Sequence, residues 1–86
     1  MPYISPNLIR AGPMTPSQAV AKAAEILGGQ AEMARRIGVK PPTISQWIAG
    51  SRPVPAVRAL DIESLTGGAV RRNELSPTFP WEKIGA

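Results

Sequence analysis

The residues best suited to chemistry are hydrogen-bonding and basic side chains gathered near the middle of the chain. Lys40 can donate to guanine O6/N7 or to a phosphate, and Gln46 can pair with adenine N6/N7 through both of its amide atoms. Ser45 and Thr43 add hydroxyl groups that both donate and accept, whereas Pro42 offers only apolar contact. This set suits recognition of base edges in DNA, with few polar groups to read the sequence directly.

Catalysis and metal binding lack their usual residues. The sequence has no histidine and no cysteine, which removes the commonest general base, the commonest metal ligands and any disulfide framework. The acidic residues are scattered, and none forms a nucleophile–base pair. We therefore expect no enzyme activity, no metal and no cofactor. No apolar run approaches the roughly 20 residues that span a membrane, and there is no signal-peptide pattern, so we expect a cytoplasmic protein without membrane contact.

The basic residues are placed unevenly along the chain. The net charge is +4, and no acid occurs between Glu32 and Asp61, a segment that holds Arg35, Arg36, Lys40, Arg52 and Arg58. Such a stretch is typical of a polyanion-binding protein, although short basic runs can also be ordinary solvated surface. We expect phosphate contacts from Gln30, Arg36 and Arg52, with Arg35 or Arg58 as further candidates.

Two short helical patterns position these side chains. The first covers about residues 30–37 and the second ends near Ala49, with Gly38 at the turn between them, where a residue free to adopt positive φ is favoured. Apolar residues recur at the three-and-four spacing of helices with one buried face. The predicted core of the unit is Ala34, Ile37, Val39, Ile44, Trp47 and Ile48. This is the pattern of a helix-turn-helix, whose second helix enters the DNA major groove.

Two adjacent prolines predict where the second helix begins. Because a residue before proline is pushed out of the α region, we expect Lys40 and Pro41 to be extended and Pro42 to take the first helical position. At 100° per residue, an inward direction defined by Ile44 and Trp47 leaves an opposite face that can meet bases. The predicted base contacts on and beside that face are Lys40, Pro42, Thr43, Ser45 and Gln46.

Further helices are expected on both sides of this unit. A helix capped by Thr15 should run from Pro16 to residue 27, with Ile26 on its buried face. Another should follow Val54-Pro55, and a short one is allowed at 69–75 with Val70 and Leu75 as its apolar contacts. In the helix after Pro55, the residues predicted to turn inward are Val57, Leu60, Ile62 and Leu65. The expected fold is all-α, with four to five short helices.

The two ends of the chain have a different composition. Residues 1–14 contain three prolines without periodicity and predict a flexible leader, and Met14 is an alternative natural start. Residues 15–75 should form the helix-turn-helix domain, and residues 76–86 an extended tail. Two interpretations of the tail stay open: its aromatic residues dock on the chain's own core, or they contact a second copy or another protein. The candidates for such a contact are Leu75, Phe79, Trp81 and Ile84.

Several segments together resemble a known group. The segments are GGQAEMARRIGV at 28–39, TISQWIAG at 43–50, RPVP at 52–55 and IESLTGGAV at 62–70. From about residue 19 to 77 the chain resembles the small phage Cro-type regulators and the YdaS-like proteins, which are often labelled antitoxins. One departure is that Ser76 and Thr78 stand where the family has a basic and an acidic residue beside the proline.

The resemblance implies a lambda-repressor-like domain and a phage or prophage repressor that binds a double-stranded DNA operator as a homodimer. In such proteins the helix-turn-helix supplies the groove contacts, and two-fold symmetry places two recognition helices about one DNA turn apart. An alternative function stays open: an antitoxin or adaptor that acts mainly through its C-terminal part on a toxin or other protein.

Overall fold

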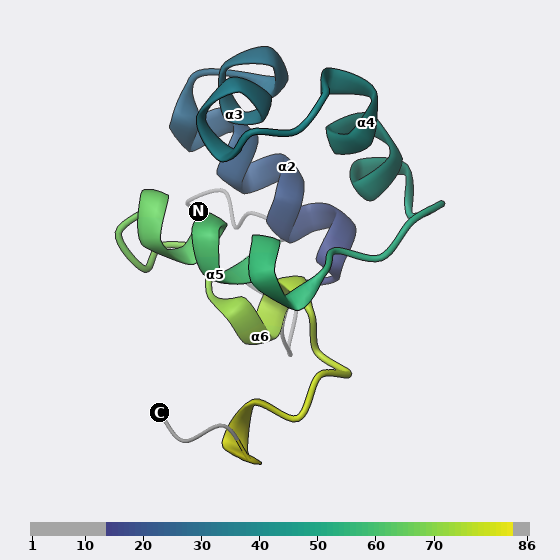
Figure 1. The fold of residues 1–86 in the computed structure, drawn as a ribbon, viewed down its shortest axis with the longest axis vertical. Coiled ribbons are helices and arrows are strands. Elements are labelled where there is room, and N and C mark those ends of the chain that lie inside the picture. The colour runs from purple at the N-terminus through teal and green to yellow at the C-terminus, as the bar shows by residue number, and fades with distance from the viewer. Residues whose placement is uncertain (1–13, 84–86) are drawn as a thin grey trace, which may run out of the picture.

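The computed structural model describes residues 14–83, and every element within that range is helical (Figure 1). The elements are α2 (Pro16–Leu27), α3 (Gln30–Ile37), α4 (Pro41–Ala49), α5 (Ala56–Leu65), α6 (Arg72–Leu75) and a 3₁₀ helix, η1 (Trp81–Lys83). The predicted all-α fold is confirmed. The expected leader, apart from Met14, and Ile84 lie outside the described residues.

The first described helix begins as its sequence predicts. Thr15 is extended and accepts a hydrogen bond at Oγ1 from the Gln18 N–H at 3.2 Å, while the Gln18 side chain accepts from the Thr15 N–H at 3.0 Å. This capping box satisfies two otherwise unpaired donors. The buried face of α2 holds Ala19, Val20, Ala23, Ala24 and Leu27. Ile26 is 46% exposed, so the prediction that it faces inward is wrong: small alanines on the other side let α3 and α4 pack closely instead.

A tight turn joins α3 to α4. Gly38 ends α3 with φ 79°, in the left-handed region that glycine enters without steric cost. Helix α4 begins at Pro41, one residue earlier than predicted, with Lys40 extended as its N-cap. Residues in the first turn of a helix need no N–H donor, and the φ of proline matches that of the helix. Pro41 and Pro42 therefore both fit there, although a residue before proline generally avoids the α region.

The predicted inward face of α5 is confirmed at Ile62, which is buried, and at Leu65, which packs against the core, but not at Val57 and Leu60. Its buried residues are Ala59 and Ile62, whereas Val57 is 62% and Leu60 39% exposed. At 100° per residue Ala59 and Ile62 share one side, and Val57 and Leu60 lie on the opposite one. The small Ala59 brings α5 close to the core. The predicted inward positions of Val57 and Leu60 are therefore wrong: apolar side chains occur on both sides of α5, and the side with Ala59 and Ile62 is the one that packs against the core.

The C-terminal segment contains a turn and a 3₁₀ helix, so it is less extended than predicted. Ser76 is buried and its hydroxyl donates to the Val54 carbonyl at 2.6 Å, while the Trp81 indole N–H donates to the Ser76 carbonyl at 2.8 Å. Trp81 is half-buried against the core. The Arg72 guanidinium lies 5.5 Å from the Trp81 ring centre, a distance that suits a cation–π contact. The buried hydrogen bond and the indole contact hold the tail on the domain.

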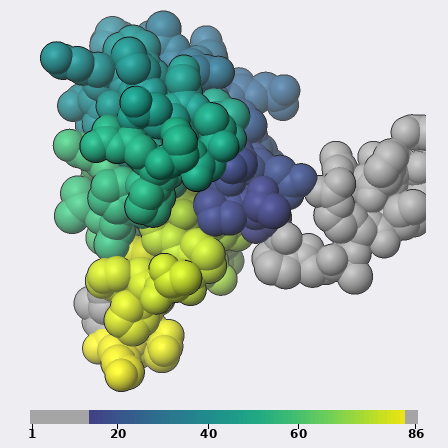
Figure 2. Space-filling model, turned by 90° about the vertical axis from the view of Figure 1, so that its right-hand side faces the viewer, coloured from purple at the N-terminus to yellow at the C-terminus, as the bar shows by residue number. Residues whose placement is uncertain are grey.

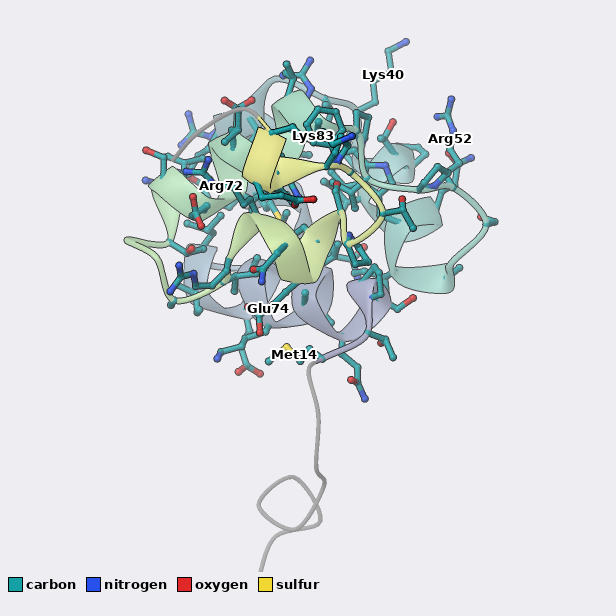
Figure 3. All side chains as sticks on the ribbon, turned by 90° about the horizontal axis from the view of Figure 1, so that it is seen from below. Met14, Lys40, Arg52, Arg72, Glu74 and Lys83 are labelled. Atoms are coloured by element: carbon teal, nitrogen blue, oxygen red, sulfur yellow. The ribbon has the colours of Figure 1, made fainter. Side chains whose placement is uncertain are left out.

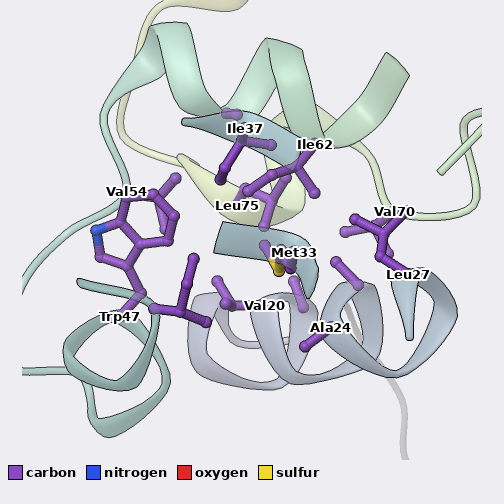
Figure 4. Packing of buried hydrophobic residues seen from close by; sticks show 14 of the residues in the cluster. Val20, Ala24, Leu27, Met33, Ile37, Trp47, Val54, Ile62, Val70 and Leu75 are labelled. Atoms are coloured by element: carbon purple, nitrogen blue, oxygen red, sulfur yellow. The ribbon is translucent and has the colours of Figure 1, made fainter. Parts of the chain in front are cut away.

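One cluster of apolar side chains joins the helices (Figure 4). Its largest fully buried members are Met33, Ile44, Ile62, Leu75, Val20 and Val70. Trp47 and Val54 lie on the side of the cluster next to α4, so core residues hold this helix in place (Figure 4). Within residues 14–83, no helix is long and apolar enough to cross a membrane.

Candidate nucleic-acid interface

Helix α4 presents its polar face to solvent. Pro42, Ser45 and Gln46 are exposed and Thr43 is half-buried, while Ile44 is fully buried. Among the other predicted core residues, Ala34, Ile37 and Trp47 are buried, and Val39 and Ile48 are half-buried against the cluster. Figure 2 shows α4 and the loop after it forming one continuous outer surface. The face available to a duplex is therefore the one away from Ile44.

The start of α3 is joined to this face by a side-chain hydrogen bond. The Ser45 hydroxyl donates to Gln30 Oε1 at 3.0 Å. The bond occupies the amide oxygen of Gln30 and leaves its amide N–H groups, which suit an acceptor-only phosphate. Gln30 is also the first residue of α3, and its N-cap Gly29 provides no side-chain acceptor, so main-chain N–H groups are available nearby.

The loop after α4 is hydrogen-bonded to Gln46. Gly50, at φ 79°, turns the chain, and the N–H groups of Ser51 and Arg52 approach the Gln46 carbonyl at 3.0 and 3.4 Å. The Ser51 hydroxyl donates to the same carbonyl at 3.3 Å. Arg52 Nη1 then donates to the Gln46 side-chain oxygen at 3.1 Å. Ser51 was not predicted as a site residue, and the only signal for it was its place between Gly50 and Arg52.

The structure brings together only some of the predicted cations. Lys40 and Arg52 extend from the same side of the molecule, away from Glu74 and Met14 (Figure 3). Arg36 lies elsewhere, beside a surface hollow between α3 and α5 that Asp61 also lines. We name Gln30, Lys40, Pro42, Thr43, Ser45, Gln46 and Arg52 the recognition surface.

Two of the five basic residues in the acid-free segment pair with carboxylates. Arg35 pairs with Glu32 one turn earlier, and this hydrogen bond holds the pKa of the Glu32 carboxyl below its ordinary value. Arg58 donates to the Ile37 carbonyl at 3.0 Å and to Asp61 at 3.3 Å, which ties α5 to the end of α3. Arg35 and Arg58 are therefore weaker candidates for phosphate contacts than Lys40 and Arg52, because a carboxylate already balances the charge of each.

The predicted partner-contact residues are divided by burial. Leu75 is 1% exposed in the core, so its predicted contact with a second copy or another protein is wrong, since the fold of one chain already covers it. Phe79 is 36% exposed and lies against Trp81 with ring centres 4.5 Å apart. Of the predicted contact residues within 14–83, Phe79 leaves the largest share of its surface open.

Glu63 pairs with two arginines of the C-terminal part. Arg72 contacts its carboxylate from the guanidinium at 2.8 Å and from the N–H at 3.1 Å, and Arg71 lies 3.8 Å away. Burial opposes ionisation of Glu63, but the Arg72 hydrogen bonds and the two positive charges together hold its pKa below the ordinary value. Arg71 and Arg72 therefore contribute less free positive charge than their number implies.

Comparison with known proteins identifies similar chains. A family model described as bacterial toxin YdaS matches residues 20–84. The "putative transcriptional regulator YdaS" of Escherichia coli K12 is 47% identical over 63 residues, which are 73% of this chain and 64% of that protein. The "regulatory protein cro" of Pseudomonas phage D3 is 37% identical over 59 residues, 69% of this chain and 81% of that protein. The present chain thus spans slightly less than two thirds of the E. coli relative.

A solved structure has the same arrangement of helices. The Cro protein "from putative prophage element Xfaso 1" of Xylella fastidiosa strain Ann-1 is 42% identical, with a TM-score of 0.64. The match covers 71% of this chain and 94% of that one. The similarity therefore extends over nearly the whole of the Cro chain.

Proposed function

The chain belongs to the YdaS family, and we propose that it is a sequence-specific DNA-binding transcription regulator of the Cro type, which reads the major groove of an operator with α4. The observation that carries the proposal is the exposed polar face of α4, hydrogen-bonded on one side to Gln30 and on the other to Arg52. The names of the E. coli and phage D3 relatives, a transcriptional regulator and a Cro protein, support it.

The recognition surface divides into two kinds of contact. Lys40, Pro42, Thr43, Ser45 and Gln46 would meet base edges, because they lie on or directly before the exposed face of α4. Gln30 and Arg52 would contact phosphates from either side and set the register of the helix in the groove. Arg36 is a peripheral phosphate candidate beside α5. This function requires no catalysis and no cofactor, and it places the protein in the cytoplasm.

A second copy would complete the operator contact. A single α4 carries few polar readers, and a dimer doubles the number of base pairs that are read. The exposed apolar side chains of α5, Val57 and Leu60, are candidates for contact between copies, since the fold of one chain leaves them uncovered, as it does Ile26 of α2. Phe79 is a further candidate.

Selection of bound sites from random duplex DNA, followed by the mass of the complex, tests this proposal. We expect an enriched site with two-fold symmetry, two chains per site, and affinity that falls steeply with salt. Gln46→Ala should remove the preference at one base pair per half-site. Recovery of no preferred sequence, with binding insensitive to salt, would contradict the proposed function.

Action on another protein is a second candidate, because the family description names a toxin and the exposed Phe79 leaves an aromatic surface open. The alternative drawn from the sequence resemblance is an antitoxin or an adaptor, whereas the family description names a toxin. Measuring whether expression of the chain slows or restores growth distinguishes the two. Deleting the tail, residues 76–86, is one way to test this candidate. That deletion would remove the Ser76–Val54 hydrogen bond and disturb the fold as well as the surface around Phe79. Phe79→Ala is a cleaner test: a changed growth effect with unchanged operator binding would favour this function.

A further inference from the structure

The loop that carries Arg52 is attached to the rest of the fold at both of its ends. Arg52 is followed by Pro-Val-Pro at 53–55, and the two prolines have no N–H group to donate. At the start of the loop, two N–H groups approach the Gln46 carbonyl of α4 at 3.0 and 3.4 Å. At its end, the Val54 carbonyl accepts a hydrogen bond from the Ser76 hydroxyl at 2.6 Å, across 22 positions of the chain. The loop therefore depends on the C-terminal segment for its second attachment.

The hydrogen bond from Ser76 fixes the direction of the Val54 peptide group. The Val54 side chain is buried in the core, but apolar contact has no preferred direction. A hydrogen bond does, because the donor must lie near the plane of the carbonyl. The rings of Pro53 and Pro55 restrict φ on either side, so the segment has fewer main-chain angles that could absorb a change at Val54.

Ser76 is itself held firmly by its surroundings. It is buried, its N–H donates to the Arg72 carbonyl at 2.9 Å, and its own carbonyl accepts from the Trp81 indole N–H at 2.8 Å. Helix α6, which ends directly before Ser76, contacts both α2 and α5. Ser76 is therefore a fixed point against which the loop is held.

Loss of the Ser76 hydroxyl would leave a buried carbonyl without this partner. Val54 is 6% exposed, so an unpaired acceptor there costs desolvation free energy, which is recovered if the segment shifts toward water. Arg52 lies two residues earlier and would shift with it. A hydrogen bond from a guanidinium to a phosphate needs a distance of about 2.7–3.2 Å, so a shift of about 1 Å is enough to break it.

We propose that Ser76 is a positioning residue for DNA binding: through the Val54 carbonyl it holds the loop that presents Arg52 to an operator phosphate. The inference rests on the proposed DNA-binding function and deepens it, because it adds a buried residue from outside the helix-turn-helix to the groups that determine affinity. Ser76 acts through Arg52 and makes no DNA contact of its own.

The test uses the full chain on its selected operator, at a temperature where circular dichroism shows each variant to be folded. Affinity is titrated at several salt concentrations for wild type, Ser76→Ala, Arg52→Ala and the double variant. Arg52→Ala should bind roughly 10-fold more weakly and reduce the slope of log affinity against log salt by about 0.9. Ser76→Ala should lower affinity by about 3- to 10-fold and reduce the same slope, because it misplaces the same contact. The double variant should bind within about twofold of Arg52→Ala, since the contact is already absent there.

Thr66→Val is the matched control for a purely structural effect. The Thr66 hydroxyl donates to the Ile62 carbonyl at 2.9 Å and accepts from the Val70 N–H at 3.2 Å, at the end of α5 farther from the loop. This variant should lower stability in urea unfolding, as Ser76→Ala does, and should leave the salt slope at the wild-type value.

Trp81→Phe is a milder second variant, which removes the indole donor to the Ser76 carbonyl and keeps an aromatic ring. It should reduce affinity and slope in the same direction by less, and it serves as the test if Ser76→Ala does not fold. A wild-type slope in the folded variants of Ser76 and Trp81, an equal reduction in Thr66→Val, or additive losses in the double variant would overturn the inference and leave the proposed function standing. Absence of salt-dependent binding by wild type to any selected duplex would overturn both.

Discussion

The recognition surface and the C-terminal part, residues 54–83, use their basic side chains in opposite ways. Among residues 14–83, Lys40 and Arg52 pair with no carboxylate, whereas Arg71 and Arg72 both lie within 4 Å of Glu63. The hydrogen bonds differ too: Ser45–Gln30 and Gln46–Arg52 are exposed, while Ser76–Val54 is buried. Similar residue types therefore leave charge available to a ligand in one region and stabilise the fold in the other.

The difference shows why a count of charges along the chain is a poor guide to a binding site. Arg35 and Arg58 lie in the acid-free segment but have partners one turn before or after them. Arg58 also donates to the Ile37 carbonyl, a contact across 21 positions. Within residues 14–83, a cation keeps its full charge for a ligand where the fold places no carboxylate beside it, as at Lys40 and Arg52.

The largest effect on stability is expected at Leu75, which the sequence analysis named as a candidate partner contact and which the structure buries in the core. Leu75→Ala should destabilise the domain by about 2–5 kcal/mol, because it opens a cavity in the core. Urea unfolding measures the loss. Phe79→Ala, at the exposed side of the same segment, should cost less than about 1 kcal/mol. Similar stability for both variants, with a change only in oligomeric state, would restore Leu75 as a contact residue.

Glu63 tests whether the C-terminal cations stabilise the fold. Glu63→Gln should cost about 1–2 kcal/mol at neutral pH, because hydrogen bonds from Arg72 to a charged acceptor become bonds to a neutral one. The folded pKa of Glu63 lies below its ordinary value of 4.5, so its contribution is complete above that pH and is lost as the pH falls through the folded pKa.

The gap in unfolding free energy between wild type and Glu63→Gln should therefore narrow below about pH 4.5, where protonated Glu63 resembles glutamine. Glu25→Gln, on the exposed side of α2, is the control and should leave stability nearly unchanged. A gap that stays constant from neutral to acid pH would mean that the ion pairs with Arg71 and Arg72 contribute little.

Lys40 and Arg71 separate the two regions by salt dependence. If Lys40 contacts a phosphate, Lys40→Ala should reduce the slope of log affinity against log salt by about 0.9, the value for one phosphate contact. If Lys40 reads guanine instead, the slope should stay unchanged and the preference at one base pair should relax. Arg71→Ala should change neither, because its charge lies beside Glu63. Titration at several salt concentrations measures both, and a reduced slope in Arg71→Ala would extend the interface to α6.

The smallest effect is expected at Glu32, which lies in the first turn of α3 and pairs with Arg35. Glu32→Gln removes a negative charge beside the proposed phosphate site at Gln30 and releases Arg35. DNA affinity should rise slightly at low salt, and the gain should vanish as salt increases. A gain of equal size at high salt would point to a change in the fold of α3, which circular dichroism would detect.

Much of the fold was predictable because it depends on neighbours along the chain. The Thr15 cap, the Gly38 turn and the ends of α2, α3 and α4 follow from side chains within about four positions, with an error of one residue at Pro41. The exposed face of α4 follows from helical periodicity alone, whichever proline begins the helix. For α5 the same reasoning placed Val57 and Leu60 wrongly, because apolar residues occur on both sides and only packing against the core selects one.

The sequence by itself determined the helix-turn-helix, its outward face and the identity of the polar side chains on it, since caps, prolines and the helical repeat act locally. Only the tertiary structure decided that Glu63 pairs with Arg71 and Arg72, that Ser76 joins the tail to Val54, and that Arg52 donates to the Gln46 side-chain oxygen. Those outcomes depend on contacts beyond one helix, such as Arg58 with Ile37 and Ser76 with Val54, and no local preference specifies them.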